Sequence, residues 1–282
     1  MKSQYLQCGR YRLSLDDSAP PLVMGILNVT PDSFSDGGRF QSLDQALSHA
    51  EQMIAEGVDI IDIGGESSRP GSQPLPLDEE LHRIMPVIYA LRDCGKPLSI
   101  DTYKPEVMRE AVAAGVDMIN DINGFRAGNA LSVVKESGCA LCIMHMQGEP
   151  LTMQKHPQYA DVTNDVISFL RERLDAAQAE GIARERICVD PGFGFGKTLE
   201  HNLTLLKNMQ RLSDELDMPV LAGLSRKSMI GAITGKPVEQ RLAGTIAANL
   251  AAIAHGARIL RVHDVAATVD AIKVWHAAQN AN

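Results

Sequence analysis

The chain has 282 residues, of which 45% are hydrophobic, and it carries a formal net charge of −8. This length and composition suffice for a large buried core, and the negative charge argues against a general nucleic-acid binder, which is usually basic. No run approaches the roughly 20 apolar residues of a membrane-spanning helix, and the first residues lack the apolar core of a signal peptide. We therefore expect a soluble, cytoplasmic protein with no nucleic-acid or membrane partner.

Residues 1–21 precede the first repeated unit of the chain. Apolar residues lie on both sides of the pair Gly9-Arg10, which is typical of a turn between two short strands. We expect this segment to form a small hairpin that caps the bottom of the domain that follows.

From residue 22 onward, short apolar runs alternate with amphipathic segments. The runs are nearly continuous in apolar and β-branched residues, as expected for parallel strands that are covered on both faces. The expected strands are 22–29, 59–64, 97–102, 117–122, 140–146, 187–191, 219–224 and 257–263. The expected helices are 42–57, 77–95, 104–115, 130–138, 165–181, 199–216, 238–256 and 265–279.

Eight strand–helix units over about 255 residues match the length of a (β/α)₈ barrel, the TIM-barrel fold. A doubly wound open sheet uses the same alternation and is the structural alternative, although it usually has fewer strands. We expect a single α/β domain, a barrel formed by residues 22–282, with the hairpin of residues 1–21 as its cap.

Five cysteines are too few and too irregular for a disulfide framework. Cys139 and Cys142 form a CxxC pair, which could serve redox chemistry or bind a metal. They lie in a predicted strand, however, where residues i and i+3 point to opposite faces, and no second CxxC pair exists to complete a zinc site. We therefore expect both cysteines to pack in the core.

The predicted strands end in polar residues. In a barrel, the carboxyl ends of the strands and the loops that follow them form the active site. In strand order these residues are Asn28; Glu66, Ser67, Ser68 and Arg69; Asp101; Asn120 and Asp121; His145; Asp190; Ser225, Arg226, Lys227 and Ser228; and Arg261 and His263. Each could cap a helix or make a structural hydrogen bond, but their gathering on one rim favours a binding site.

The polar strand ends fall into two chemical groups. Asp101, Asn120 and Asp190 offer hydrogen-bond acceptors, which suit a planar heterocycle with a row of N–H donors. The second group is basic and suits an anion, most plausibly phosphate. Its members are Arg69, Lys227, Arg261 and His263. The rim therefore predicts a polar heterocycle bound beside a phosphate.

The segment DPGFGFGKT (190–198) resembles a phosphate-binding Walker A loop, because it follows a strand and ends in GKT. That motif requires glycine at the position of Pro191, so we do not expect nucleotide binding here. We expect the glycines to place Phe195 at the rim as an apolar wall.

Several motifs occur in the order found in the dihydropteroate synthase family, and they cover residues 22 to about 276. The motifs are GILNVTPDSFSDGG, DIIDIGGESSRPG, SIDT, NDI, DPGFGFGK, GLSRKSMIG and ILRVHD. The chain is therefore identified as resembling this family. The resemblance implies condensation of (7,8-dihydropterin-6-yl)methyl diphosphate with 4-aminobenzoate, a step of folate synthesis. It also implies Mg²⁺, a homodimer and inhibition by sulfonamides.

The resemblance assigns roles to individual residues. Asp101, Asn120, Asp190 and Lys227 would hold the pterin, and Asn28 would contact Mg²⁺ on the diphosphate. Arg69, Arg261 and His263 would bind the diphosphate itself. The 4-aminobenzoate site would consist of Phe34, Ser68, Pro70, Phe195, Lys227 and Ser228.

The implied catalytic set is Asp36, Asp101, Lys227 and Arg261. Asp36 is our candidate for stabilising the cation left when diphosphate departs, although Asp32 on the same loop is an alternative. Ser68 stands where the family usually has threonine, which keeps the hydroxyl but removes a methyl contact.

Three other functions fit part of this pattern. A pterin-binding methyltransferase barrel would share the acceptor residues but has no need of the phosphate-handling loops. A non-catalytic pterin-binding protein would bind the ligand without turnover. A Schiff-base lyase could use Lys227, but it would leave the neighbouring Arg226 and the phosphate-handling loops unexplained.

Overall fold

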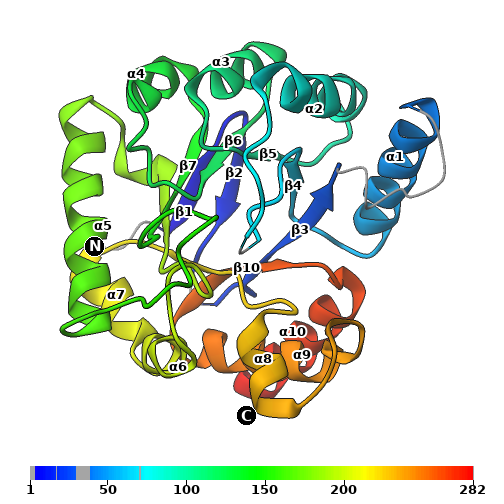
Figure 1. Cartoon of the computed structure of the whole chain (residues 1–282). Helices are drawn as coiled ribbons and strands as arrows, with labels where there is room; N and C mark the ends of the chain where they lie inside the picture. Colours follow the sequence, from blue (N-terminus) through cyan, green and yellow to red (C-terminus); the bar gives the residue numbers. More distant parts are fainter. Residues whose placement is uncertain (1–3, 17, 30–38, 70, 282) are drawn as a thin grey trace.

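The computed structural model describes residues 4–16, 18–29, 39–69 and 71–281. Within these ranges, eight parallel strands close into a barrel in the order β10-β3-β4-β5-β6-β7-β8-β9 (Figure 1). The strands are β3 (Leu22–Asn28), β4 (Ile60–Gly64), β5 (Leu98–Asp101), β6 (Met118–Asp121), β7 (Ala140–Met144), β8 (Ile187–Asp190), β9 (Val220–Ala222) and β10 (Ala257–Val262). Because β10 pairs with β3, the sheet has no free edge, which confirms the barrel and excludes the open sheet.

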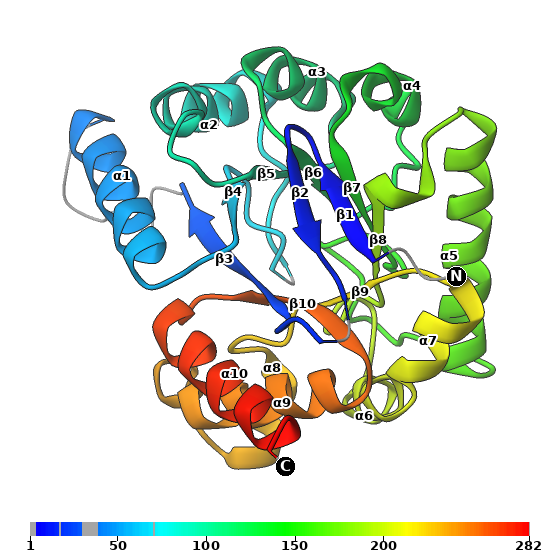
Figure 2. The ribbon, with the colours of Figure 1, turned by 180° about the vertical axis from the view of Figure 1, so that it is seen from behind.

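Helices surround the strands (Figures 1 and 2). They are α1 (Arg39–Ala55), α2 (Leu77–Leu91), α3 (Pro105–Ala114), α4 (Ala130–Val134), α5 (Val162–Ala179), α6 (Leu199–Lys207), α7 (Met209–Leu216), α8 (Ser228–Thr234), α9 (Leu242–Ala254) and α10 (Val265–Gln279). Within the described ranges, no helix combines the length and the apolar character needed to cross a membrane.

The expected helix 199–216 is two helices, because α6 ends and α7 begins at Asn208. The Asn208 side chain donates to the carbonyl of Thr204 at 2.9 Å, and its backbone leaves the helical conformation at φ −99° and ψ 13°. Asparagine favours such local side-chain bonds over an uninterrupted helix. The expected helix 238–256 likewise begins later, at Leu242, after a short 3₁₀ turn.

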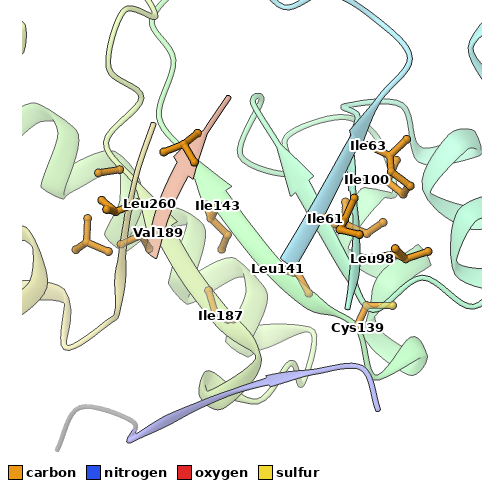
Figure 3. Packing of buried hydrophobic residues seen from close by; sticks show 14 of the residues in the cluster. Ile61, Ile63, Leu98, Ile100, Cys139, Leu141, Ile143, Ile187, Val189 and Leu260 are labelled. Carbon is orange, nitrogen blue, oxygen red and sulfur yellow. The ribbon is translucent and has the colours of Figure 1, made fainter. Parts of the chain in front are cut away.

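Two apolar layers follow from the alternation of side chains along each strand. One set packs outward against the helices, as Figure 3 shows for Ile61, Ile100, Leu141 and Val189. The other set fills the lower half of the barrel. It comprises Met24, Ile60, Met118, Ala140, Cys142, Cys188, Leu221 and Ile259, together with Leu6, Cys8, Leu15 and Leu22.

The N-terminal hairpin closes the bottom of the barrel. It consists of β1 (Tyr5–Cys8) and β2 (Tyr11–Ser14), which pair antiparallel. Gly9 joins them at φ +54°, and a Cβ there would lie 2.5 Å from the carboxylate of Asp117. Asp117 in turn accepts from the backbone N–H of Leu98 at 3.1 Å, so the turn rests against the strand ends. The hairpin predicted from the sequence is thereby confirmed.

The CxxC pair is split between the two layers. Cys139 packs outward with the helices, whereas Cys142 lies inside the barrel, and both are buried free thiols. Cys142 is paired in register with Cys188 on the next strand. The prediction that these cysteines pack in the core is confirmed.

Candidate active site

The centre of the barrel mouth is held by an arginine between two carboxylates. Arg261 on β10 donates through Nε to Asp62 Oδ2 at 2.6 Å and through an Nη to Asp101 Oδ2 at 2.7 Å. Asn120 on β6 donates to the same oxygen of Asp62 at 3.3 Å. Four strands therefore contribute to one polar layer, and its side chains are largely buried.

Sequence reasoning missed Asp62. It lies at the middle of β4 rather than at its end, inside the apolar run IIDIG, and it is fully buried. The signal was a charged residue in a strand that is otherwise apolar, because a buried carboxylate needs a partner. Its partner, Arg261, is 199 residues away in the sequence.

Burial dominates the electrostatics of this layer. It raises the pKa of Asp101 to about 7, even though Arg261 acts in the opposite direction. Burial would also lower the pKa of Arg261, but Asp62 and Asp101 outweigh it, so its pKa is raised and the guanidinium stays charged. The arginine predicted to bind an anion therefore already balances two acidic groups.

Two buried acceptor atoms of this layer have no hydrogen-bond partner within the described ranges, Asp62 Oδ1 and Asn120 Oδ1. Buried polar atoms are normally paired, so these two acceptors call for a partner, which a bound ligand or a water would supply. A ligand edge with N–H donors would satisfy both atoms.

Asp190 at the end of β8 adds a third acceptor. Its Oδ1 accepts from the backbone N–H of Gly192 at 2.7 Å, and burial raises the pKa of the carboxyl. A Cβ placed on Gly223 would lie 3.8 Å from its Oδ2, so glycine there keeps the second oxygen unobstructed from that side.

The loop after β8 is built around Lys197. Its ammonium contacts the carbonyls of Gly192 at 2.9 Å and Phe195 at 3.0 Å and His145 Nδ1 at 2.9 Å, and the residue is 3% exposed. Burial lowers the pKa of Lys197 to about 7 and that of His145 to about 2. Lys197, the lysine of the GKT sequence, thus uses its ammonium to stabilise its own loop, and it does not point toward a phosphate site.

Phe195 forms an apolar wall at the rim, as the sequence predicts. It packs with Ile122, Met144, Met146 and Met153 in a small cluster above the barrel core. Lys227 from the loop after β9 places Nζ 4.2 Å from the centre of the Phe195 ring. Burial lowers the pKa of Lys227 to about 8, and the nearby Asp190 opposes this shift.

Neither His263 nor Arg226 offers an unpaired positive charge to a ligand in the described part of the chain. Ser225 Oγ lies 3.0 Å from His263 Nδ1, and burial, followed by Arg261, lowers the histidine pKa to about 4. His263 is therefore neutral at pH 7 and offers a hydrogen bond rather than a charge. Arg226 adopts φ +57° and makes two bonds to Asp264, at 2.6 and 3.0 Å.

The remaining predicted residues occupy various positions. Asn28 ends β3 half-buried beside Gly64, and Ser68 is half-buried in the loop after β4. Arg69 and Ser228 are exposed. The Asp121 carboxylate stabilises its own turn, where it accepts from the backbone N–H groups of Asn123 and Phe125. The residues Asp32, Phe34, Asp36 and Pro70 lie outside the described ranges.

The predicted metal contact is a single amide oxygen. The described ranges contain no group of three or more His, Cys, Asp or Glu that could hold a metal ion. Mg²⁺ prefers hard oxygen ligands and usually binds through one or two protein groups, several waters and substrate phosphates. A single protein oxygen such as that of Asn28 therefore fits an ion that a diphosphate and water would also ligate.

Known proteins share both this fold and its sequence. A family model described as pterin binding enzyme matches residues 24–263. Dihydropteroate synthase of Haemophilus influenzae is 52% identical over 94% of this chain and 96% of its own length. The Burkholderia cenocepacia dihydropteroate synthase, solved with 7,8-dihydropteroate, superposes with a TM-score of 0.89 at 53% identity, covering 99% of this chain and 98% of that one. The Xanthomonas albilineans dihydropteroate synthase, solved with 4-aminobenzoic acid, gives 0.92 at 50% identity, covering 99% and 100%. The chain therefore belongs to the pterin-binding enzyme family, among its dihydropteroate synthases.

Proposed function

We propose that the chain joins (7,8-dihydropterin-6-yl)methyl diphosphate to 4-aminobenzoate and releases 7,8-dihydropteroate and diphosphate. The observation that carries this proposal is the buried layer of acceptors, Asp62, Asn120 and Asp190, at the mouth of a barrel whose relatives bind this product. A pterin offers amide, amine and ring N–H donors along one edge, which matches such a layer.

The acceptor layer would hold the pterin ring. Asp190 retains Oδ2 for the ligand, since its Oδ1 is used by Gly192. Asn120 Oδ1 and Asp62 Oδ1 are the atoms that gain a donor on binding. Lys227, beside Asp190, contributes a further donor whose pKa of about 8 leaves it largely protonated at pH 7.

The diphosphate would lie between the strand ends on the other side of the mouth. Arg69 supplies an exposed cation and His263 a neutral ring held by Ser225. Asn28 would contact Mg²⁺, which, when bound, spreads the negative charge of the leaving group. Arg261, whose guanidinium is paired with Asp62 and Asp101, offsets the negative charge of these carboxylates near the diphosphate.

The aminobenzoate would lie against Phe195, with Ser68, Lys227 and Ser228 around it.

In the reaction, the bond between the pterin methylene carbon and the diphosphate oxygen breaks, and diphosphate leaves with the electron pair. The amine nitrogen then bonds to the methylene carbon and releases a proton. An aromatic amine is weakly basic, so its cationic adduct loses the proton without a strong base. The roles assigned to Asp36, Phe34 and Pro70 stay predictions.

We further propose a homodimer in the cytoplasm. Three exposed apolar side chains lie close together in the chain, Ile233 on α8, Val238 in the 3₁₀ turn that follows and Leu242 at the start of α9. Because α8 packs against α9, this surface suits a contact with a second copy. All five cysteines are free, as expected in a reducing compartment. Sedimentation equilibrium of the wild type and of Ile233→Asp would test the dimer.

A turnover assay tests the activity. The purified chain, the pterin diphosphate, 4-aminobenzoate and Mg²⁺ should yield dihydropteroate and diphosphate in equal amounts. Omission of 4-aminobenzoate should stop product formation, and a sulfonamide should compete with it. Pterin binding without turnover would instead support the non-catalytic alternative, and methyl transfer would support the methyltransferase alternative.

A further inference from the structure

A buried charge cluster lies beside the site, and no step above uses it. The Lys104 ammonium contacts Glu66 Oε2 and lies 2.5 Å from Glu80 Oε2. The hydroxyl of Tyr103 donates to the other Glu66 oxygen at 2.8 Å. The side chains are shielded from water, with exposed fractions of 11% for Glu66, 16% for Lys104 and 1% for Glu80. We call these four residues the rim cluster.

The rim cluster joins two loops that carry site residues. Glu66 precedes Ser68 by two positions in the loop after β4, and Tyr103 follows Asp101 by two positions in the loop after β5. Both carboxylate oxygens of Glu66 are therefore held by the neighbouring loop. Glu80 on α2 holds Lys104 from behind, so the ammonium is fixed from two sides.

In the segment between Gly65 and Gly71, the described residues 66–69 are linked to the neighbouring loop through Glu66. Arg83 holds the Gly65 carbonyl at 3.0 Å, and Gly71 donates to Pro150 at 3.0 Å. In the described part of that segment, the hydrogen bonds that reach another loop are those of Glu66, whereas the others stay within the loop.

The rim cluster also adjoins the apolar wall. The ring of Tyr103 packs against the cluster that contains Phe195, while its hydroxyl holds Glu66. Glu66, Ser68, Asp101 and Tyr103 line one small pocket at this point. A buried ion pair costs desolvation energy and contributes little net stability, so fixing a geometry is a use that suits its position.

We propose that Glu66 is a positioning residue, which Lys104 and Tyr103 hold so that Ser68 and Arg69 are fixed for 4-aminobenzoate and diphosphate. This inference rests on the proposed function. The acceptors that would hold the pterin ring, Asp62, Asn120 and Asp190, make no hydrogen bond to the rim cluster among those of the described residues. Loss of the rim cluster should therefore weaken the binding of 4-aminobenzoate and of diphosphate, and it should leave the binding of the pterin ring unchanged.

Glu66→Gln and Lys104→Met test the proposal. We expect each to raise the KM for 4-aminobenzoate by about tenfold, the scale of one lost hydrogen bond to a charged group. The Kd of a pterin that lacks the diphosphate should stay within about twofold, because the ring acceptors are untouched. Lys104→Arg retains the charge and should recover most of the loss. Lys135→Met, which removes the surface pair with Glu180, is the matched control and should leave the KM unchanged.

Equal losses of pterin and aminobenzoate affinity, or a lower Tm with an unchanged KM, would overturn the proposal. Tyr103→Phe keeps the ring and removes one hydrogen bond, so it covers the case in which the charge variants do not fold, and it should shift the KM in the same direction. Calorimetry of 4-aminobenzoate in the presence of diphosphate repeats the comparison without turnover. Failure of the wild type to turn over would therefore be distinguishable from failure of the positioning role.

Discussion

Arg261 shows how the partners of a residue set its role. Its type and its place at a strand end indicate a phosphate ligand, but its guanidinium lies between Asp62 and Asp101. Two buried carboxylates without a cation would be costly, so the arginine makes the acidic mouth possible. The same balance keeps Asp62 available as an acceptor, because one of its oxygens has no partner among the residues that the structure describes.

The first prediction concerns this arginine. Arg261→Met should lower the free energy of unfolding by about 3–5 kcal/mol at pH 8, because it leaves Asp62 and Asp101 buried without a cation. Urea denaturation measures this loss, and Arg261→Lys, which keeps a charge at the position, should lose less.

The loss should depend on pH with a defined sign. The pKa of Asp101 is raised to about 7 in the folded protein, whereas an unfolded aspartate titrates near 4. The folded state therefore binds a proton between these values, and stability from this group increases as the pH falls from about 7 to about 4. Arg261 lowers the pKa of Asp101, so its removal should raise that pKa further, and the variant should gain more stability than the wild type as the pH falls. The deficit of Arg261→Met should therefore be smaller at pH 5.5 than at pH 8. An equal deficit at both pH values would contradict this account.

At the scale of elements, the loop after β8 shows how a rim is held without regular structure. Gly192 at φ +70° passes so close to the chain that a Cβ would lie 1.9 Å from the His145 carbonyl. The Lys197 ammonium then stabilises the loop, because it donates to the carbonyls of Gly192 and Phe195 from within the loop. The glycines allow the close approach and the lysine satisfies the carbonyls that result, which places Phe195 at the rim.

The second prediction follows from this loop. Lys197→Met should cost about 1–3 kcal/mol of stability, since the carbonyls of Gly192 and Phe195 lose a buried donor. Because Phe195 is then less well held, the KM for 4-aminobenzoate should also increase. Urea denaturation and steady-state kinetics check the two effects. Lys207→Met, at an exposed lysine of α6, should change neither value.

At the scale of the whole molecule, the barrel could be predicted because its strands are apolar and regularly spaced. The same pattern indicated which ends carry function, and Asp101, Asn120 and Asp190 do lie there. Asp62 and the rim cluster could not be predicted in this way. Their contacts join different loops and strands, up to 199 residues apart, and depend on barrel closure, which periodicity does not describe. The break at Asn208 was missed because the apolar spacing continues across it.

The last prediction separates the two ends of the barrel. Leu6 on the hairpin is fully buried in the same apolar cluster as Met24 and Ile60. This cluster fills the end of the barrel opposite the polar mouth. Leu6→Ala should lower the free energy of unfolding by about 2–5 kcal/mol, because it leaves a cavity at the bottom of the barrel. The kcat and both KM values should stay unchanged at temperatures where the variant is folded, because in barrels of this kind the bottom serves stability and the top serves chemistry. Arg12→Ala, at an exposed position of β2, is the control, and a change in KM for Leu6→Ala would show that the two ends are coupled.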